Sequence, residues 1–181
     1  MEQSAIPHEE NVIEAVLAGE RAGELEGRAV LVSAGGTREP IDAVRVIANR
    51  SSGKQGYAIA AEAASRGAQV TLVSTVDLPV PAGVEVCTVE TAAQMAAALS
   101  QHAPKADVVI MAAAVADFRP VASSPERLHE KLKKAKGIPE VVLEPTPDIL
   151  ARLGANKPAG QVLVGFAAET SDLIANATSK L

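Results

Sequence analysis

Residues 35–56, GGTREPIDAVRVIANRSSGKQG, have the residue types in this chain best suited to bind an anion. The segment contains two glycine-rich turns, four cationic side chains and an asparagine, Asn49. It follows a strand-like run at 28–33 and precedes a helix-like run at 56–66. Glycine and serine at a strand-to-helix junction leave backbone N–H groups facing outward, and the helix dipole adds to their field. We therefore expect a phosphate or nucleotide to bind here.

Two familiar phosphate-binding motifs do not fit this segment. A Walker A loop requires glycine where Ala48 stands and Ser or Thr where Gln55 stands. Of the dinucleotide fingerprint G-x-G-x-x-G, only Gly53 and Gly56 keep the last spacing. The phosphate site therefore belongs to neither motif.

The frame S-G-K-x-G-x-A-I-A is close to that of nicotinamide-dependent short-chain reductases. Those enzymes transfer a proton with a Tyr and a Lys four residues apart. The single tyrosine, Tyr57, has Ala61 at that spacing. Reductase chemistry is therefore the weaker alternative.

A second group of cations, EKLKKAK at 130–136, follows an apolar run at 106–117. Lysines on a mobile loop can neutralise a triphosphate and leave with pyrophosphate. The charge run is also compatible with a solvated helix face. Its position after the apolar run favours a phosphate role for at least one lysine.

The composition limits the partners that this chain can have. The formal net charge is −5 and aromatic residues make up 2% of the chain, which argues against nucleic acid and anionic membranes. The single cysteine, Cys87, is expected to be structural. We find neither a signal peptide nor a transmembrane run and expect a cytoplasmic protein.

Strand-like and helix-like runs alternate along the chain. Strands are expected at 28–33, 68–75, 84–89, 106–117, 140–145 and 161–167, and helices at 56–66, after an N-cap at Thr91, at 146–154 and at the end of the chain. This rhythm predicts an α/β fold: a three-layer, doubly wound, mainly parallel sheet that is Rossmann-like. Residues 1–27 are expected to form a linker or helix outside the core, and 28–181 the nucleotide-binding domain.

Ligands of such sheets bind beyond the carboxyl ends of the strands. Loops 34–55, 113–137 and 166–172 leave such ends, so we expect them to meet in space. Asp117 ends an apolar run, where a carboxylate needs a partner or a ligand. Asp148 could bind a ligand or serve as a negative charge in the first turn of a helix.

Five motifs in order carry a resemblance to a known family. GGTREPID-x-VR-x-I-x-N-x-SSGK-x-G, AAAVADFRP, K-x-KK, TPDIL and GFAAET resemble the motifs of phosphopantothenoylcysteine synthetase, a phosphopantothenate–cysteine ligase of coenzyme A biosynthesis. In bacteria this is often the C-terminal half of a bifunctional protein, whose other half is a flavin-dependent decarboxylase. The resemblance covers roughly residues 28–181, and 1–27 resembles the linker between the halves.

The resemblance implies a ligation in two steps. The carboxylate of 4′-phosphopantothenate attacks the α-phosphate of CTP, which gives an acyl-cytidylate and releases pyrophosphate. The cysteine amine then attacks the activated carbonyl and releases CMP. The family implies Mg²⁺ with CTP, a homodimer, and flavin only in the separate decarboxylase domain. The residues alone do not distinguish CTP from ATP.

The resemblance also assigns roles by motif position. Asn49 corresponds to the residue that handles the acyl-cytidylate, and Lys131 to the mobile-loop lysine, a role that Lys133 or Lys134 could also take. The implied nucleotide-binding residues are Met111, Ala112, Ala113, Asp117, Lys131, Pro147, Asp148, Ile149, Leu150, Phe166 and Lys180. The implied phosphate- or substrate-binding residues are Gly35, Gly36, Arg45, Ser51, Ser52, Gly53, Lys54 and Lys133. No metal ligands are assigned.

One departure concerns the end of the chain. Family members continue past the equivalent of SKL with a further lysine and a strand, whereas this sequence ends at Leu181. We expect the last part of the ligase domain to be missing, with weaker nucleotide binding or no turnover. A nucleotide-binding module without turnover therefore remains an alternative beside the reductase.

Overall fold

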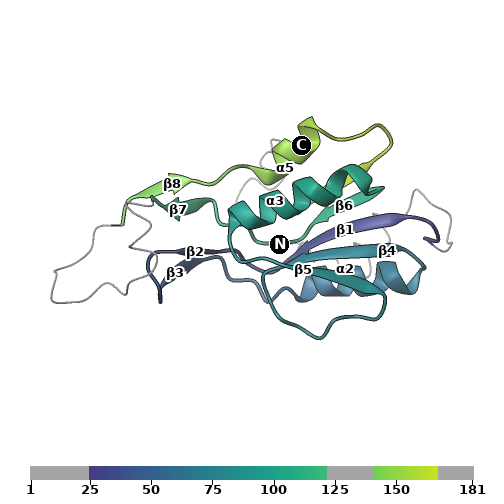
Figure 1. Cartoon of the computed structure of the whole chain (residues 1–181), viewed down its shortest axis with the longest axis horizontal. Coiled ribbons are helices and arrows are strands. Elements are labelled where there is room, and N and C mark those ends of the chain that lie inside the picture. The colour runs from purple at the N-terminus through teal and green to yellow at the C-terminus, as the bar shows by residue number, and fades with distance from the viewer. Residues whose placement is uncertain (1–24, 122–140, 167–181) are drawn as a thin grey trace, which may run out of the picture.

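Five parallel strands form the central sheet, in the order β5-β4-β1-β6-β9 (Figure 1). The computed structural model describes residues 25–121 and 141–166. The strands are β1 (Ala29–Ala34), β4 (Gln69–Ser74), β5 (Val84–Thr88), β6 (Val108–Met111) and β9 (Val162–Gly165). Register pairs Val32 of β1 with Leu72 of β4 and Ile110 of β6. The strand order reverses between β1 and β6, so the predicted doubly wound, Rossmann-like sheet is confirmed.

Helices cover both faces of this sheet and give the three predicted layers. Helix α2 (Lys54–Ser65) packs on one face. On the other lie α3 (Ala92–His102), the 3-10 helix η1 (Ala103–Lys105) and α5 (Ile149–Ala155). The predicted N-cap Thr91 is confirmed, because its hydroxyl accepts a hydrogen bond from the Gln94 N–H at 3.2 Å.

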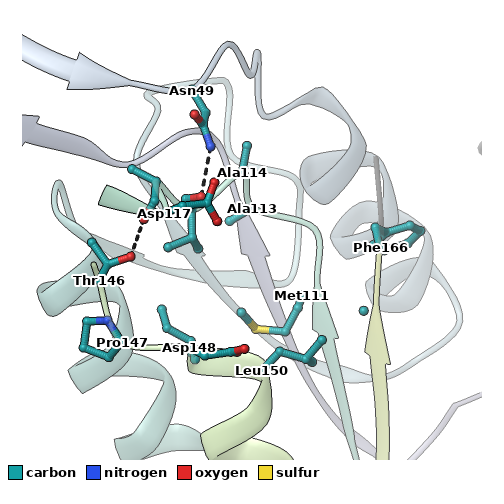
Figure 2. Close-up of a pocket in the computed structure, with 14 residues that line it drawn as sticks. Asn49, Met111, Ala113, Ala114, Asp117, Thr146, Pro147, Asp148, Leu150 and Phe166 are labelled. Atoms are coloured by element: carbon teal, nitrogen blue, oxygen red, sulfur yellow. Dashed lines mark hydrogen bonds between the residues drawn. The ribbon is translucent and has the colours of Figure 1, made fainter. Parts of the chain in front are cut away.

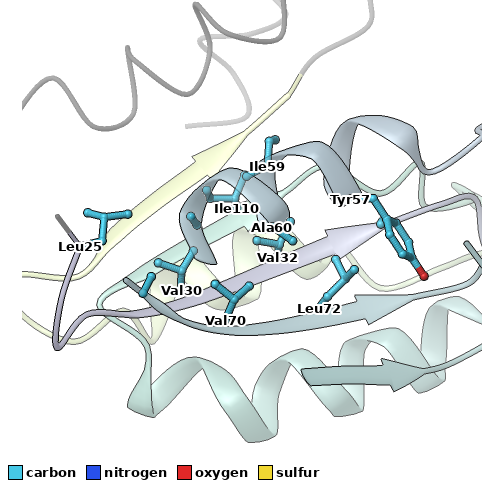
Figure 3. Packing of buried hydrophobic residues seen from close by; sticks show 12 residues of the cluster. Leu25, Val30, Val32, Tyr57, Ile59, Ala60, Val70, Leu72 and Ile110 are labelled. Carbon is cyan, nitrogen blue, oxygen red and sulfur yellow. The ribbon is translucent and has the colours of Figure 1, made fainter. Parts of the chain in front are cut away.

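The core is aliphatic on both faces of the sheet. Figure 3 shows Val30, Val32 and Val70 packed beneath α2, whose Ile59 and Ala60 point toward the strands. On the opposite face Leu31, Val73 and Val109 pack against α3 and α5, and half-buried Cys87 lies at the edge of that cluster. Strands buried on both faces explain the near-continuous apolar runs in the sequence.

Helix α2 approaches β1 more closely than a side chain would allow. A Cβ at Gly56 would lie 2.6 Å from the Ala34 Cβ and 2.8 Å from the Ser33 carbonyl oxygen. Glycine at this position therefore sets the distance between helix and strand.

The expectation that residues 1–27 lie outside the core is wrong for Leu25. Leu25 is 3% exposed and packs in the cluster beneath α2. Its N–H donates to the Arg66 carbonyl, and the Gln69 N–H donates to the Arg28 carbonyl at 2.8 Å. The chain is thus fixed to the sheet before β1 begins.

Two antiparallel ribbons project from the carboxyl end of the sheet (Figure 1). The first pairs β2 (Arg38–Pro40) with β3 (Val46–Ala48), and the second pairs β7 (Phe118–Pro120) with β8 (Leu143–Pro145). We call these ribbons the arms. They were not predicted from the sequence.

The arms correct two predicted strands. The run 106–117 is not one buried strand, because β6 ends at Met111. Beyond it the Ala113 N–H donates to the Ser33 hydroxyl at 3.1 Å. The run 140–145 is not a strand of the main sheet, since β8 pairs with β7 in an arm. In addition, α2 begins at Lys54 rather than at residue 56.

In residues 25–121 and 141–166, no helix is both long and apolar enough to cross a membrane.

Candidate functional site

The loops after β1 and β6 meet where the strand order reverses. Gly36 forms an isolated parallel bridge with Ala114. The Ala114 N–H donates to the Gly35 carbonyl at 2.8 Å, and the Thr37 N–H donates to the Ala114 carbonyl at 3.3 Å. The predicted meeting of loops 34–55 and 113–137 is confirmed for their described parts.

Four small residues lie together next to the start of α2, namely Gly35, Gly36, Ser51 and Gly53. A Cβ at Gly53 would lie 3.4 Å from the Gly35 nitrogen, and one at Gly36 would lie 3.5 Å from the Ser51 Cβ. Gly53 is the N-cap of α2 and has no side chain with which to cap the helix. The group has the features of the predicted phosphate cradle, namely small residues at a helix N-terminus.

The two serines and the lysine of this segment lie at the same turn. The Ser51 hydroxyl accepts from the Gly53 N–H and the Ser52 hydroxyl from the Lys54 N–H, both at 3.4 Å. Lys54 is the first residue of α2 and is exposed. An anion at the helix N-terminus would therefore have a cationic side chain within reach.

Gly36 also lets the chain cross itself beside Asn49. A Cβ at Gly36 would lie only 2.5 Å from the Asn49 carbonyl oxygen. Any side chain at Gly36 would displace the backbone of Asn49 and hence its amide group. The position of the Asn49 amide therefore depends on glycine at residue 36.

A cavity of about 350 Å³ opens beside this crossing, at the carboxyl ends of β6 and β9 (Figure 2). Its walls come from four separate segments of the chain. They are Asn49, Met111, Ala113, Ala114, Val115, Ala116, Asp117, Thr146, Pro147, Asp148, Ile149, Leu150, Gly165 and Phe166. Most of the predicted nucleotide-binding residues within the described part of the chain therefore line one cavity.

Asn49 lies at the mouth of this cavity. Its side-chain amide donates to the Val115 carbonyl at 2.9 Å, and the residue is exposed (Figure 2). The hydrogen bond joins the first arm's return strand to the loop after β6. Asn49 is thus held in place and is still open to solvent.

The two aspartates of the cavity differ in their contacts. Asp117 is exposed, not buried as the apolar run before it suggested, and the Thr146 N–H donates to its backbone carbonyl at 2.9 Å. Asp148 is the N-cap of α5 and accepts from the Ala151 N–H at 2.9 Å. The Asp148 carboxylate is therefore used to cap a helix. The exposed Asp117 carboxylate has no such role in α5.

The floor of the cavity is apolar. Met111 is 7% exposed and Leu150 half-buried, whereas Phe166 is 37% exposed at the rim. A Cβ at Gly165 would lie 2.6 Å from a Leu150 methyl carbon, so the strand and α5 are in close contact. An apolar floor beneath a few polar groups suits the flat face of a base.

Some predicted residues lie elsewhere. Ala112 is half-buried beside the cavity but does not line it. Arg45 is at the turn of the first arm and forms an ion pair with Asp42, with Nη2 and Oδ2 2.6 Å apart. Lys131, Lys133 and Lys180 are outside the described residues.

The described part of the chain offers no ready-made metal centre. Among those residues, no group of three or more His, Cys, Asp and Glu side chains could hold a metal ion. The aspartates of the cavity do not join such a group.

Sequence reasoning missed the two threonines that hold the loop after β6. The Thr37 hydroxyl accepts from the Ala116 N–H at 2.9 Å, and the Thr146 hydroxyl donates to the Ala116 carbonyl. Both stand inside motifs already noted, GGTREP and TPDIL. The sequence did offer a signal, because Thr37 directly follows Gly-Gly and Thr146 directly precedes a proline.

The chain matches a known protein family over residues 25–181. The family is described as the DNA/pantothenate metabolism flavoprotein C-terminal domain. The match includes the glycine-rich loop, the cavity and both arms.

Curated relatives are longer than this chain. It is 53% identical over 156 residues to the coenzyme A biosynthesis bifunctional protein CoaBC of Mycobacterium bovis, covering 82% of this chain and 37% of that protein. The chain therefore spans just over a third of that relative's length.

Solved structures share the fold. The crystal structure of the C-terminal domain of a CoaBC protein aligns with a TM-score of 0.72 at 45% identity, covering 86% of this chain and 72% of that one. A Cab2 mutant in complex with phosphopantothenate-cysteine aligns with a TM-score of 0.64 at 19% identity, covering 94% and 72%.

Proposed function

The chain belongs to the family of DNA/pantothenate metabolism flavoprotein C-terminal domains, and on this premise we propose that it is a phosphopantothenate–cysteine ligase. The reaction joins 4′-phosphopantothenate to L-cysteine at the expense of CTP, through an acyl-cytidylate. The products are 4′-phosphopantothenoylcysteine, CMP and pyrophosphate. The name of the CoaBC relatives supports a role in coenzyme A biosynthesis, which would take place in the cytoplasm.

One observation supports this proposal more than any other. The glycine-rich cradle at α2 and the cavity at β6 and β9 are neighbours, and Asn49 lies between them. The first step needs two anions to meet, because the carboxylate of phosphopantothenate attacks the α-phosphate of CTP. A phosphate cradle and a base-sized cavity that share a polar residue fit this need.

The cavity suits the cytidine of CTP. Its apolar floor, with Phe166 at the rim, would contact the faces of the base, and the Asp117 carboxylate would accept from ribose hydroxyls or the base. Ala113 and residues 147–150 line the same space. Pre-formed walls reduce the entropy lost when the nucleotide binds.

We propose that Asn49 acts on the acyl-cytidylate. Its amide is held by the Val115 carbonyl and stands between the cavity and the glycine turn at Gly36. An amide beside the acyl group can stabilise charge that develops on the carbonyl oxygen during attack by cysteine. In this role Asn49 acts in the second step and not in the first.

Cations for the triphosphate come from Lys54 at the start of α2 and, as we propose, from Lys131 or Lys133. We propose Mg²⁺ as a companion of the CTP phosphates, because phosphate oxygens are ligands that Mg²⁺ prefers. Flavin belongs to a fused decarboxylase domain, which the name of the bifunctional relatives supports. No step of the ligation is assigned to either group.

A ligand titration tests the choice of nucleotide. CTP with Mg²⁺ should raise the thermal midpoint of unfolding, because a ligand that binds only the folded state stabilises it. NADPH should not, because this chain keeps only the last two glycines of the dinucleotide fingerprint, Gly53 and Gly56. Stabilisation by NADPH together with no response to CTP would refute the ligase.

A substitution of Asn49 tests its step. In the full-length protein, Asn49→Asp should leave pyrophosphate release in place while product formation falls by about a hundredfold, the loss expected for one oxyanion donor. Asn156→Asp is a matched control, because the Asn156 amide also donates to a backbone carbonyl, that of Arg152, at 2.8 Å. If both variants form product at the unaltered rate, Asn49 has no role in the mechanism.

We propose that the arms mediate a homodimer. Val46 and Phe118 of the arms and Val142, which directly precedes β8, are apolar and are 44%, 53% and 57% exposed. A second copy of the chain would bury these residues and close the site beside Asn49 and Asp117.

Val142→Asp should shift sedimentation from dimer to monomer, whereas Val80→Asp, at a 56% exposed valine in another loop, should not. An unchanged dimer in Val142→Asp would remove this face from the interface.

A further inference from the structure

Both backbone groups of Ala116 are held by threonine side chains from other segments. The Ala116 N–H donates to the Thr37 hydroxyl at 2.9 Å, 79 residues away in sequence. The Ala116 carbonyl accepts from the Thr146 hydroxyl, 30 residues away. Figure 2 shows Thr146 pointing at this loop from the opposite side to Asn49. We call Thr37 and Thr146 the threonine clamp.

Thr37 is the buried half of the clamp. Its side chain is fully buried, and its own N–H donates to the Ala114 carbonyl at 3.3 Å. The residue thus contacts the loop after β6 with both its backbone and its hydroxyl. A buried backbone N–H without an acceptor is costly, so the Ala116 N–H depends on this hydroxyl.

Thr146 is the half of the clamp that lies in the cavity wall. It is half-buried, and its N–H donates to the Asp117 carbonyl at 2.9 Å. It therefore holds two successive residues, Ala116 by its hydroxyl and Asp117 by its backbone. It also immediately precedes Pro147 and the α5 N-cap Asp148, so the same residue ties α5 to the loop.

The clamped peptide lies between two groups of the proposed reaction. Val115, on one side of Ala116, supplies the carbonyl that holds Asn49. Asp117, on the other side, supplies the carboxylate proposed to contact the nucleotide. The position of Ala116 thus sets the positions of both Asn49 and Asp117.

We propose that Thr37 and Thr146 are positioning residues for the ligation, which fix the loop at Ala116 so that Asp117 and Asn49 have the correct separation for the nucleotide and its acyl adduct. The inference rests on the proposed function. Neither threonine needs to touch a reacting atom, because each acts through the Ala116 backbone.

Equilibrium binding of CTP with Mg²⁺ by calorimetry tests the clamp in the full-length protein. Thr37→Val keeps the shape of the side chain and removes the hydroxyl, and we expect the Kd for CTP and the KM for CTP in pyrophosphate release to rise about tenfold, the effect of one lost hydrogen bond. Thr37→Ser restores the hydroxyl and should return both constants to within about twofold. Rescue by serine distinguishes positioning from simple packing.

Thr91→Val is the matched control. It removes a threonine hydroxyl that also accepts a backbone N–H, that of Gln94 at 3.2 Å, but it lies at the N-cap of α3 away from the cavity. Thr91→Val should lower the thermal midpoint and leave CTP binding unchanged. Thr37→Val with unchanged Kd and KM would overturn the inference, whatever its thermal midpoint.

Thr146→Val tests the other half and covers the case in which Thr37→Val does not fold. We expect a similar rise in the Kd for CTP. In the double variant the Kd should rise by less than the product of the two single fold-changes, because both threonines hold the same peptide. Unchanged binding by Thr146→Val, or independent effects in the double variant, would refute the clamp. If the unaltered protein binds no CTP, the proposed function itself fails and the inference fails with it.

Discussion

The sheet and the arms of this molecule use apolar residues in opposite ways. The strands of the sheet place side chains such as Leu31, Val32 and Leu72 at 1% exposure or less. The arms, only three residues long in each strand, leave Val46, Phe118 and Leu143 at 44% exposure or more. The sheet is stabilised by its own core, whereas the arms have too little core to be stable without a neighbour.

The candidate site lies at the junction of these two regions. Asn49 follows β3, Asp117 precedes β7 and Thr146 follows β8, so each stands where an arm joins the body of the protein. The sheet supplies fixed strand ends, and the arms supply the exposed polar groups. The buried core thus lies in the sheet, whereas the residues of the candidate site lie at the junction.

The largest difference between the regions should appear on truncation of a core side chain. Leu72 is fully buried, so Leu72→Ala should lower the free energy of unfolding by about 2–5 kcal/mol. Val142→Ala in the arm region, where the side chain is 57% exposed, should cost less than about 0.5 kcal/mol within a protomer. Urea denaturation of the monomer measures the free energy of unfolding of both variants. Equal losses would contradict the claim that the core lies in the sheet and not in the arms.

The next effect concerns the contact between α2 and β1. Gly56→Ala places a Cβ 2.6 Å from the Ala34 Cβ, and we expect a loss of about 1–3 kcal/mol from overpacking. Gly154→Ala in α5 meets only a Leu163 methyl carbon at 3.8 Å and should stabilise by about 0.5–1 kcal/mol, the helix preference of alanine. We expect thermal unfolding to show a loss of stability for Gly56→Ala and a gain for Gly154→Ala. A gain in both variants would show that α2 can move away from β1.

A smaller effect is expected where the first arm joins α3. Glu39 is 3% exposed, and its carboxylate accepts from the Ala92 N–H at 2.8 Å, at the N-terminus of α3. Glu39→Gln keeps an acceptor but removes the charge that the helix dipole favours, so we expect a loss of about 1 kcal/mol. Glu90→Gln, which changes an exposed charge just before the helix, is the control and should cost less. A larger loss for Glu90→Gln would refute the role of burial.

The smallest effect should come from the ion pair within the second arm. Arg119 Nε and Glu144 Oε1 are 2.8 Å apart, and both side chains are 41% exposed. Glu144→Gln should change stability by no more than about 1 kcal/mol, and less in high salt, because exposed charges are screened. Chemical denaturation at low and high salt checks this; a salt-independent loss would indicate that the pair is buried by a partner.

The sheet was predictable because its strands are long apolar runs. Buried strands such as 28–33 and 68–75 stand out against their polar neighbours, and the alternation with helices determines parallel order. The close approach of the glycine loop and the loop after β6 followed from that order alone. The arrangement of the candidate site could therefore be predicted in outline.

The arms and the threonine clamp were not predictable for a different reason. The arm strands are three residues long, and three of the four end in proline, at Pro40, Pro120 and Pro145, so no period-two pattern has room to appear. The clamp depends on which distant backbone group meets a hydroxyl, as Thr37 meets Ala116. Such a pairing is a property of the folded chain and has no local signature in the sequence.

The burial of Leu25 has a consequence for the side from which the chain enters the sheet. Leu25 fixes the chain at the amino end of β1, whereas the candidate site lies at the carboxyl end of the same strand. Six residues of extended strand separate the two ends by about 20 Å. The apolar cluster beneath α2 that contains Leu25 shares no residue with the lining of the cavity. The point at which the chain is fixed before β1 and the point at which a ligand would bind are therefore independent parts of one domain.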